Sequence, residues 1–268
     1  MGRITDKLNQ TKADGRAALV TYVMAGDPNL EDSAKILAML SHAGADIIEL
    51  GMPFTDPVAD GPTIQLAGER AIKSGTNVGK IFAMVKNFRQ SNDTTPIILM
   101  GYYNPVYHYG SQAFLDDAKA AGVDGFIIVD LPLEETAQFQ EPAQNMGFDF
   151  ISLITPATPN GRIKAISDQA SGFLYYVSIT GITGTKSATQ SDLQNAIKRI
   201  KQNSQLPIAI GFGINDALKA KQAGEIADAV VVGSSIVGRI AQAGEKPIED
   251  VLQNVESFVS SLSQALKS

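Results

Sequence analysis

A short apolar strand runs directly into a long loop in the stretch Asp46-Ile-Ile-Glu-Leu-Gly-Met-Pro-Phe-Thr-Asp-Pro-Val-Ala-Asp-Gly-Pro62. The strand is expected over residues 46–50, with Glu49 near its carboxyl end. A carboxylate among isoleucine and leucine side chains is unfavourable unless it is paired or used, because burial disfavours its charged form. Asp46, at the start of the strand, is expected to be a solvated turn residue. Glu49 is therefore the first candidate for chemistry, with half of a structural ion pair as the alternative.

The same alternation of strand, loop and helix repeats along the chain. Each expected strand is short and almost wholly apolar, as in parallel strands that are covered on both faces. About eight such units in 268 residues favour an α/β fold, a (β/α)8 TIM barrel, as one domain over residues 1–268. The expected strands cover residues 18–24, 46–50, 96–100, 125–129, 148–154, 172–177, 207–210 and 227–232.

Helices are expected at both ends of the chain and after several of the strands. A short helix over residues 4–11 precedes the first strand, and residues 64–72 and 78–88 form two helices after the second strand. One continuous helix is expected over residues 133–146. Pro247 is expected at the first position of the closing helix, in which apolar residues recur at helical spacing.

Composition argues against several classes of protein. The net charge is -6 and no basic run stands out, so binding to nucleic acid is not expected. Cysteine is absent and the two histidines, His42 and His108, lie far apart, which disfavours disulfides, thiolate chemistry and a His/Cys metal site. No apolar stretch approaches the roughly 18 residues of a membrane span. We expect a cytoplasmic protein, or one of the plastid stroma if the source is a plant, although no transit peptide is present.

Glycine-rich loops follow the last two expected strands. Gly211-Phe-Gly213 follows the seventh strand, and Gly233-Ser-Ser235 follows the eighth. Glycines let backbone N–H groups approach an anion closely, and in barrels the seventh and eighth loops commonly bind phosphate. Either segment alone could be a tight turn, but the two at these positions predict a phosphate site.

A Gly/Thr/Ser-rich loop over residues 178–189 could close over a site as a lid or be plain surface. No lysine lies in an expected strand or at its immediate carboxyl end, with Lys186 of this loop as the nearest exception. A Schiff-base aldolase is therefore disfavoured. The residues instead predict acid–base chemistry on an organic phosphate, with Glu49 and Asp60 as the acids.

A family resemblance is carried by the stretch Ile48-Glu-Leu-Gly-Met-Pro-Phe-Thr-Asp-Pro-Val-Ala-Asp-Gly-Pro-Thr-Ile-Gln65, which is similar to the signature of the tryptophan synthase alpha subunits. The likeness spans nearly the whole chain, and this first motif is long enough to be strongly specific. It implies a carbon–carbon lyase of tryptophan biosynthesis that cleaves indole-3-glycerol phosphate by a retro-aldol step into indole and glyceraldehyde 3-phosphate. Supporting matches are Tyr102, Asn104, Tyr175, Gly181 to Gly184, Gly211 to Gly213, Gly233 and Ser234.

The resemblance also implies roles for single residues. Glu49 would be the general acid–base, which protonates the indole ring carbon and takes the hydroxyl proton of the side chain. Asp60 would stabilise the positive charge at the indole nitrogen, Thr183 would bond Asp60, and Phe212 would pack on the indole. The other residues of the indole pocket would be Tyr22, Met100, Ile127, Val129, Leu153 and Tyr175. The phosphate would be bound by Gly184, Gly213, Gly233 and Ser234.

Members of this family work with a beta subunit that carries pyridoxal phosphate, so the resemblance implies an alpha2beta2 heterotetramer. Pro53, Asp56, Asn104 and Pro105 would face that partner, and the chain itself would need no cofactor and no metal. One departure is Tyr22, which stands where the family often has phenylalanine. The alternatives are a stand-alone indole-producing lyase, another phosphate-binding barrel enzyme, and a barrel that only activates a beta partner.

Overall fold

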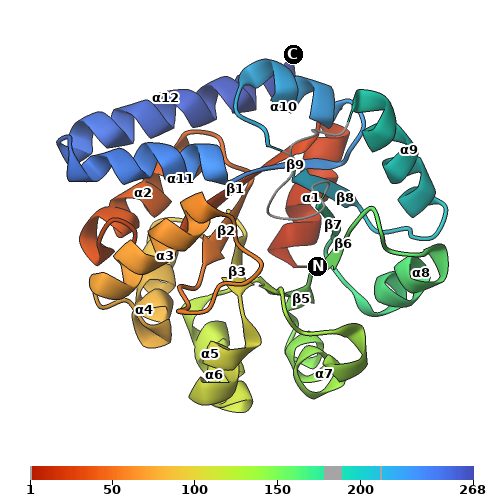
Figure 1. Cartoon of the computed structure of the whole chain (residues 1–268), viewed down its shortest axis with the longest axis horizontal. Helices are drawn as coiled ribbons and strands as arrows, with labels where there is room; N and C mark the ends of the chain where they lie inside the picture. Colours follow the sequence, from red (N-terminus) through yellow and green to blue (C-terminus); the bar gives the residue numbers. More distant parts are fainter. Residues whose placement is uncertain (1, 178–188, 212) are drawn as a thin grey trace.

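The computed structural model describes residues 2–177, 189–211 and 213–268. Its strands are β1 (Ala18–Met24), β2 (Ile47–Gly51), β3 (Ile97–Gly101), β4 (Gly125–Ile128), β5 (Asp149–Phe150), β6 (Ser152–Ile154), β7 (Leu174–Val177), β8 (Ile208–Gly211) and β9 (Ala229–Val232). Within the described residues these nine strands form one sheet in the order β5-β4-β3-β2-β1-β9-β8-β7-β6. The strands lie at the centre of the molecule and the helices surround them (Figure 1).

The two ends of this sheet meet in the fifth strand of the barrel. β5 pairs with β4, and β6 pairs with β7. Between them, the Ile151 amide still donates a hydrogen bond of 3.0 Å to the Phe126 carbonyl of β4. The predicted closed barrel is therefore confirmed. The strand expected over residues 148–154 is divided into β5 and β6. Up to Ile151 its backbone hydrogen bonds run to β4, and after Ile151 it pairs with β7.

The helices cover the outer face of the strands. They are α1 (Arg3–Ala13), α2 (Leu30–His42), α3 (Pro62–Lys73), α4 (Val78–Arg89), α5 (Tyr103–Tyr109), α6 (Ser111–Ala121), α7 (Ala137–Asn145), α8 (Asn160–Gln169), α9 (Gln190–Lys201), α10 (Ala217–Gly224), α11 (Ser234–Ile240) and α12 (Ile248–Lys267), with 3-10 helices η1 (Leu133–Glu135) and η2 (Ala241–Gly244). In the part of the chain that the structure describes, no helix combines the length and the apolar character that a membrane crossing requires.

Two predictions for helices need correction, and one helix was missed. The continuous helix expected over residues 133–146 is η1 followed by α7, since the Thr136 hydroxyl bonds the Leu133 carbonyl at 2.8 Å and ends the first turn. Pro247 is the N-cap of α12 and not its first residue. The short helix α5 was not predicted. Its Pro105 lies in the first turn, where a missing backbone N–H removes no helical hydrogen bond.

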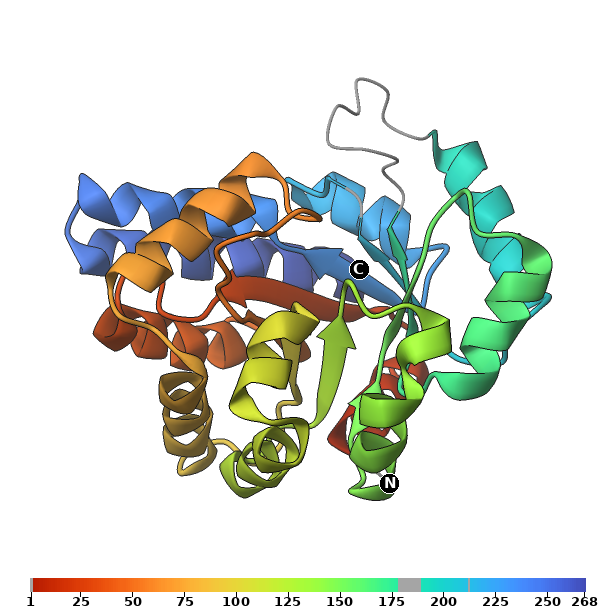
Figure 2. The same cartoon turned by 60° about the horizontal axis from the view of Figure 1, so that its bottom comes forward.

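Helix α1 closes the amino end of the barrel. Ile4 and Leu8 of α1 are buried in the same cluster as the inward-facing residues of the strands, among them Val20, Ile98 and Ile127. Figure 2 shows α1, in red, below the strands, and the loop that leads into α3, in orange, on the other side. The carboxyl ends of the strands are thus the open end of the barrel.

Aspartates just before three of the strands hold the amino end together. Each carboxylate accepts a hydrogen bond from an amide at the start of the preceding strand in the sheet. The pairs are Asp46 with Leu19 (2.8 Å), Asp124 with Ile97 (2.8 Å) and Asp228 with Ile208 (2.9 Å). Asp46 is also bound by both terminal nitrogens of Arg16, at 2.7 and 2.9 Å, and is only 7% exposed. The expectation of a solvated Asp46 was wrong, because the carboxylate pairs an otherwise open amide and a guanidinium.

Replacing Asp46 by alanine is predicted to destabilise the fold by about 3 kcal/mol, because the substitution leaves Arg16 without its carboxylate and the Leu19 amide without an acceptor. Urea denaturation of Asp46→Ala measures the change. The control is Asp168→Ala, which breaks an exposed pair with Lys164 (3.0 Å). That substitution should alter the free energy of unfolding by less than about 0.5 kcal/mol. Equal effects of the two substitutions would contradict the structural role of Asp46.

Candidate active site

A cavity of about 200 Å³ opens at the carboxyl end of the strands. Its wall combines side chains from β1, β2, β3, β7 and β9 with the loops that follow β2, β8 and β9. Eight of the residues predicted from the sequence line it, namely Tyr22, Glu49, Asp60, Met100, Tyr175, Gly213, Gly233 and Ser234. The barrel therefore brings both predicted acids and both predicted glycine-rich loops to one space.

Glu49 points into the barrel from the middle of β2. Because side chains alternate along a strand, Ile48 and Leu50 pack on the outer side against the helices. Tyr22 of β1 and Ile98 of β3 lie beside Glu49 in register. Glu49 is 0% exposed, and neither carboxyl oxygen has a hydrogen-bond partner among the described residues. Burial raises the pKa of Glu49 to about 8, so at neutral pH the side chain is mostly a neutral acid that can donate a proton.

Asp60 reaches the same cavity from the loop between β2 and α3. The backbone around it is fixed, because the Gln65 side chain donates to the Asp60 carbonyl at 2.8 Å and the Ala59 amide donates to the Tyr102 hydroxyl at 3.0 Å. Partial burial raises the pKa of Asp60 above its usual value, while a hydrogen bond with Tyr102 acts in the opposite direction. Tyr102 thus ties both the loop and the carboxylate to the end of β3.

Two tyrosine side chains pack over glycines of the neighbouring strands. The Tyr22 hydroxyl lies against Gly51 of β2, and the Tyr175 hydroxyl lies against Gly211 of β8. A Cβ at either glycine would collide with the hydroxyl, so these two positions have no room for a side chain. The glycines therefore allow the phenol rings to extend over the mouth of the barrel.

The loops after β8 and β9 meet at the other side of the cavity. Gly213 has a φ of 40°, a left-handed conformation that glycine adopts readily. The Ser235 hydroxyl donates to the Ile214 carbonyl at 3.0 Å and joins the two loops. The amides of Ser234 and Ser235 begin α11 and have no acceptor within the helix. This arrangement can offer backbone N–H groups and a serine hydroxyl to an anion.

Not every predicted pocket residue lies at this cavity. Ile127 is completely buried deeper in the barrel, and Val129 and Leu153 line a neighbouring cavity of about 180 Å³. Thr183, Gly184 and Phe212 lie outside the described residues, as does nearly all of the loop over residues 178–189. No group of three or more potential metal-binding side chains occurs in the described ranges.

The structure adds lining residues that the sequence did not mark as site residues. They are Ile64, Ile214 and Val231. Val231 could have been found from strand alternation, since it lies two residues before Gly233 on the inward face of β9. Ile214 carried no such signal, because its place depends on the contact between the two loops.

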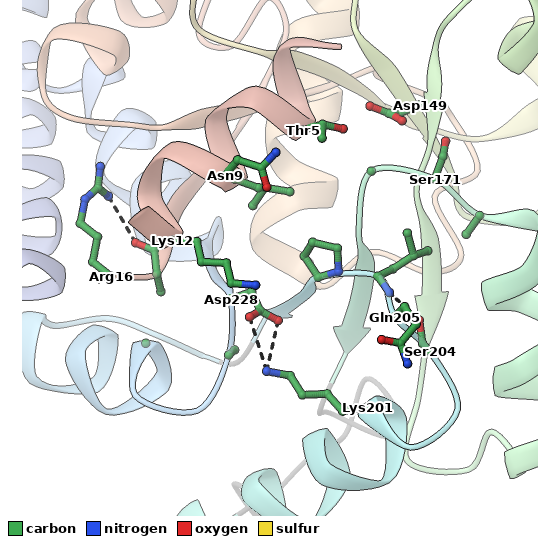
Figure 3. A pocket seen from close by; sticks show the side chains of 18 of the residues that line it. Thr5, Asn9, Lys12, Arg16, Asp149, Ser171, Lys201, Ser204, Gln205 and Asp228 are labelled. Carbon is green, nitrogen blue, oxygen red and sulfur yellow. Dashed lines mark hydrogen bonds and ion pairs between the residues drawn. The ribbon is translucent and has the colours of Figure 1, made fainter. Parts of the chain in front are cut away.

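A larger cavity, of about 720 Å³, lies at the amino end of the barrel beside α1 (Figure 3). Its charged side chains are largely engaged in structural pairs, such as Lys201 with Asp228 at 3.4 Å, which Figure 3 shows, and Arg16 with Asp46. The buried acid lies at the opposite end, where the catalytic groups of barrel enzymes are found. The smaller cavity is therefore the candidate active site.

Comparisons with known proteins show the family of this chain. The family model of the tryptophan synthase alpha chain matches residues 8–267. The chain is 38% identical to tryptophan synthase subunit alpha from Legionella pneumophila str. Paris, with 99% of this chain and 98% of that chain covered and a TM-score of 0.92. It is 34% identical to a chain from Aquifex aeolicus VF5, with 100% of both chains covered and a TM-score of 0.90. It is 30% identical to tryptophan synthase from M. tuberculosis, with 100% of this chain and 99% of that chain covered and a TM-score of 0.89. Because the match extends over nearly its whole length, this chain belongs to the tryptophan synthase alpha chain family.

Proposed function

We propose that this chain cleaves indole-3-glycerol phosphate into indole and glyceraldehyde 3-phosphate, with Glu49 as the proton-transfer group. The observation that carries the proposal is a fully buried Glu49, with a pKa of about 8, in one cavity with Asp60 and the two glycine-rich loops. A different phosphate-binding barrel enzyme is not favoured, because the alpha chain family matches residues 8–267.

In the proposed reaction, neutral Glu49 first donates its proton to the indole ring carbon that carries the glycerol phosphate chain. The ring nitrogen then bears a positive charge, which the Asp60 carboxylate stabilises. The Glu49 carboxylate next takes the proton of the side-chain hydroxyl on the carbon attached to the ring. The carbon–carbon bond breaks, its electron pair returns to the ring, and a carbonyl forms on the phosphate fragment. One proton leaves Glu49 and one returns, so the residue ends in its starting form.

The electrostatics of the cavity suit these roles. An acid with a pKa near the working pH is both a good donor and a good acceptor of protons. Glu49 meets this condition through burial alone. Asp60 must stay charged to stabilise a cation, and its hydrogen bond with Tyr102 supports the charged form against partial burial. The two carboxyl groups can thus hold different protonation states in the same small space.

The phosphate is proposed to lie between the loops after β8 and β9. The support is the shared cavity, the unpaired first amides of α11 and the Ser235 bond that joins the loops. Gly213, Gly233 and Ser234 would bind the phosphate, and Tyr22, Met100 and Tyr175 would contact the substrate from the strands. The roles of Thr183, Gly184 and Phe212 remain predictions from the family resemblance.

We also propose that a beta subunit covers the loops after β2 and β3. The support is the exposure of two large side chains, Val58 of the first loop, which is 80% exposed, and Tyr107 of α5, which is 72% exposed. Phe54 and Tyr102, whose ring centroids are 5.4 Å apart, connect these loops to each other and to Asp60. Pyridoxal phosphate would belong to that partner. Partner binding would reach the site through these loops, and the complex would work in the cytoplasm.

Glu49→Gln is predicted to reduce indole release by roughly a hundredfold to ten-thousandfold, because the amide neither donates nor takes the required proton. Indole formation from indole-3-glycerol phosphate measures the effect, with and without a beta subunit. Asp60→Asn should also lower the rate severely, while both variants still bind a phosphate-bearing substrate analogue. Normal turnover by Glu49→Gln would refute the assignment, and absence of indole release by the wild type with a beta subunit would refute the function.

Ser234→Ala is predicted to weaken phosphate binding by about 1 kcal/mol, or somewhat more for a charged acceptor, since one hydrogen bond is lost. The Michaelis constant for indole-3-glycerol phosphate should rise accordingly, with little change in kcat. The matched control is the same substrate without its phosphate, for which the variant and the wild type should behave alike. An equal loss with both substrates would place Ser234 away from the phosphate.

Burial of Glu49 also predicts a pH-dependent stability. The unfolded chain releases this proton near pH 4.5 and the folded chain near pH 8, so the unfolded state is favoured progressively as the pH rises between these values. Glu49→Gln lacks this effect. Its free energy of unfolding should therefore exceed that of the wild type increasingly from pH 5 to pH 8, by up to roughly 1.4 kcal/mol per pH unit, and then level off. A difference that does not change with pH would show that Glu49 is not buried as a neutral acid.

A further inference from the structure

Tyr22 carries a hydroxyl group that the proposed reaction does not yet use. Tyr22 of β1 is the register partner of Glu49 in β2, and both side chains line the same cavity. The Tyr22 hydroxyl forms no hydrogen bond with any of the described residues. An unpaired donor thus lies on the strand next to an unpaired, buried carboxyl group.

The glycines around Tyr22 place its hydroxyl on the side of Glu49 that faces the barrel mouth. Gly51, against which the hydroxyl lies, follows Glu49 by two residues on the same inward face of β2. Two residues span roughly 6.6 Å along a strand, which is within the combined reach of a glutamate side chain and a phenol. Gly233 supports the other end of the tyrosine, because a Cβ there would lie 3.2 Å from the Tyr22 Cβ.

Glu49 needs a donor only after it has lost its proton. A carboxylate in this enclosed space is stabilised strongly by any hydrogen bond it gains, because water is excluded from both oxygens. The other titratable groups that face the pair are Asp60, which is an acceptor when charged, Tyr175 on the opposite wall, and Tyr102, which is already bonded to the Asp60 loop. Among the described residues, Tyr22 is the tyrosine on a strand adjacent to β2 that lines the cavity and whose O–H has no hydrogen-bond partner.

We propose that the Tyr22 hydroxyl is a positioning group, which donates a hydrogen bond to the Glu49 carboxylate formed after proton transfer to the indole ring. The bond would hold the carboxylate toward the barrel mouth, where the substrate hydroxyl must give up its proton. This inference rests on the proposed role of Glu49. It deepens that role by assigning the group that keeps Glu49 in place between its two proton transfers.

The test is Tyr22→Phe, which removes the hydroxyl and keeps the ring against Gly233. The pKa of Glu49 is measured in the free protein by carbon-13 NMR of labelled glutamate carboxyl groups, with Glu49→Gln to assign the signal. Loss of the donor should raise this pKa by roughly one unit, since only the ionised form loses a hydrogen bond. The basic limb of kcat/KM should move to higher pH by the same amount, and kcat should fall roughly tenfold with little change in KM.

Tyr176→Phe is the matched control. Tyr176 is also a buried tyrosine, but it packs in the apolar cluster outside the barrel with Ile154 and Leu193. Its substitution should leave the Glu49 titration and kcat unchanged. An unaltered pKa of Glu49 in Tyr22→Phe would overturn the inference, as would an equal shift in Tyr176→Phe. The titration requires no substrate, so its outcome is separate from whether the wild-type chain releases indole.

Discussion

The structure depends on one unfavourable burial, that of the Glu49 carboxyl group inside a barrel of apolar side chains. A buried carboxyl group without a partner is stable only as the neutral acid, and the pKa of about 8 expresses this constraint. An arginine or lysine placed beside Glu49 would remove the strain and also the proton. The absence of such a partner in the described residues is therefore what makes this side chain fit for proton transfer.

The unfavourably buried Glu49 and the ion pairs that stabilise the barrel lie at opposite ends of the strands. At the amino end, carboxylates such as Asp46 and Asp124 are paired with arginines and strand amides. At the carboxyl end, within the described residues, the Glu49 carboxyl group is unpaired and the Asp60 carboxyl group has a hydrogen bond with the Tyr102 hydroxyl. Identical chemical groups thus serve stability at one end and reactivity at the other, because their neighbours differ.

Much of the fold could be predicted from local patterns. The first strand has the predicted bounds, Ala18–Met24, because an apolar β-branched run ends there at a Gly/Pro turn. What could not be predicted depends on contacts between distant segments. The pairing of Asp46 with Arg16 requires the barrel to bring two strand starts together, and nothing near Asp46 in the sequence signals it.

The candidate site shows the same division. Glu49 and the glycine-rich loops could be placed at the same end of the barrel. The alternation of side chains along each strand and the order of the strands can both be read from the sequence. The position of a residue along the barrel axis cannot be read from the sequence in this way. Ile127 faces inward, but it lies below the cavity that it was expected to line. Ile214 belongs to the site through its carbonyl, which accepts a hydrogen bond from Ser235, and this contact joins two loops.

The divided fifth strand has a mechanical consequence. β5 shares two register pairs with β4, the fewest of any two neighbouring strands in the described sheet, whereas β1 and β2 share five. In the order of the sheet, this weakly bonded seam lies across the barrel from β1, β2 and β9. Transient breathing of the closed sheet would begin at the seam, where the fewest backbone bonds must open. The wall that carries Tyr22, Glu49 and Gly233 would keep its shape during such fluctuations.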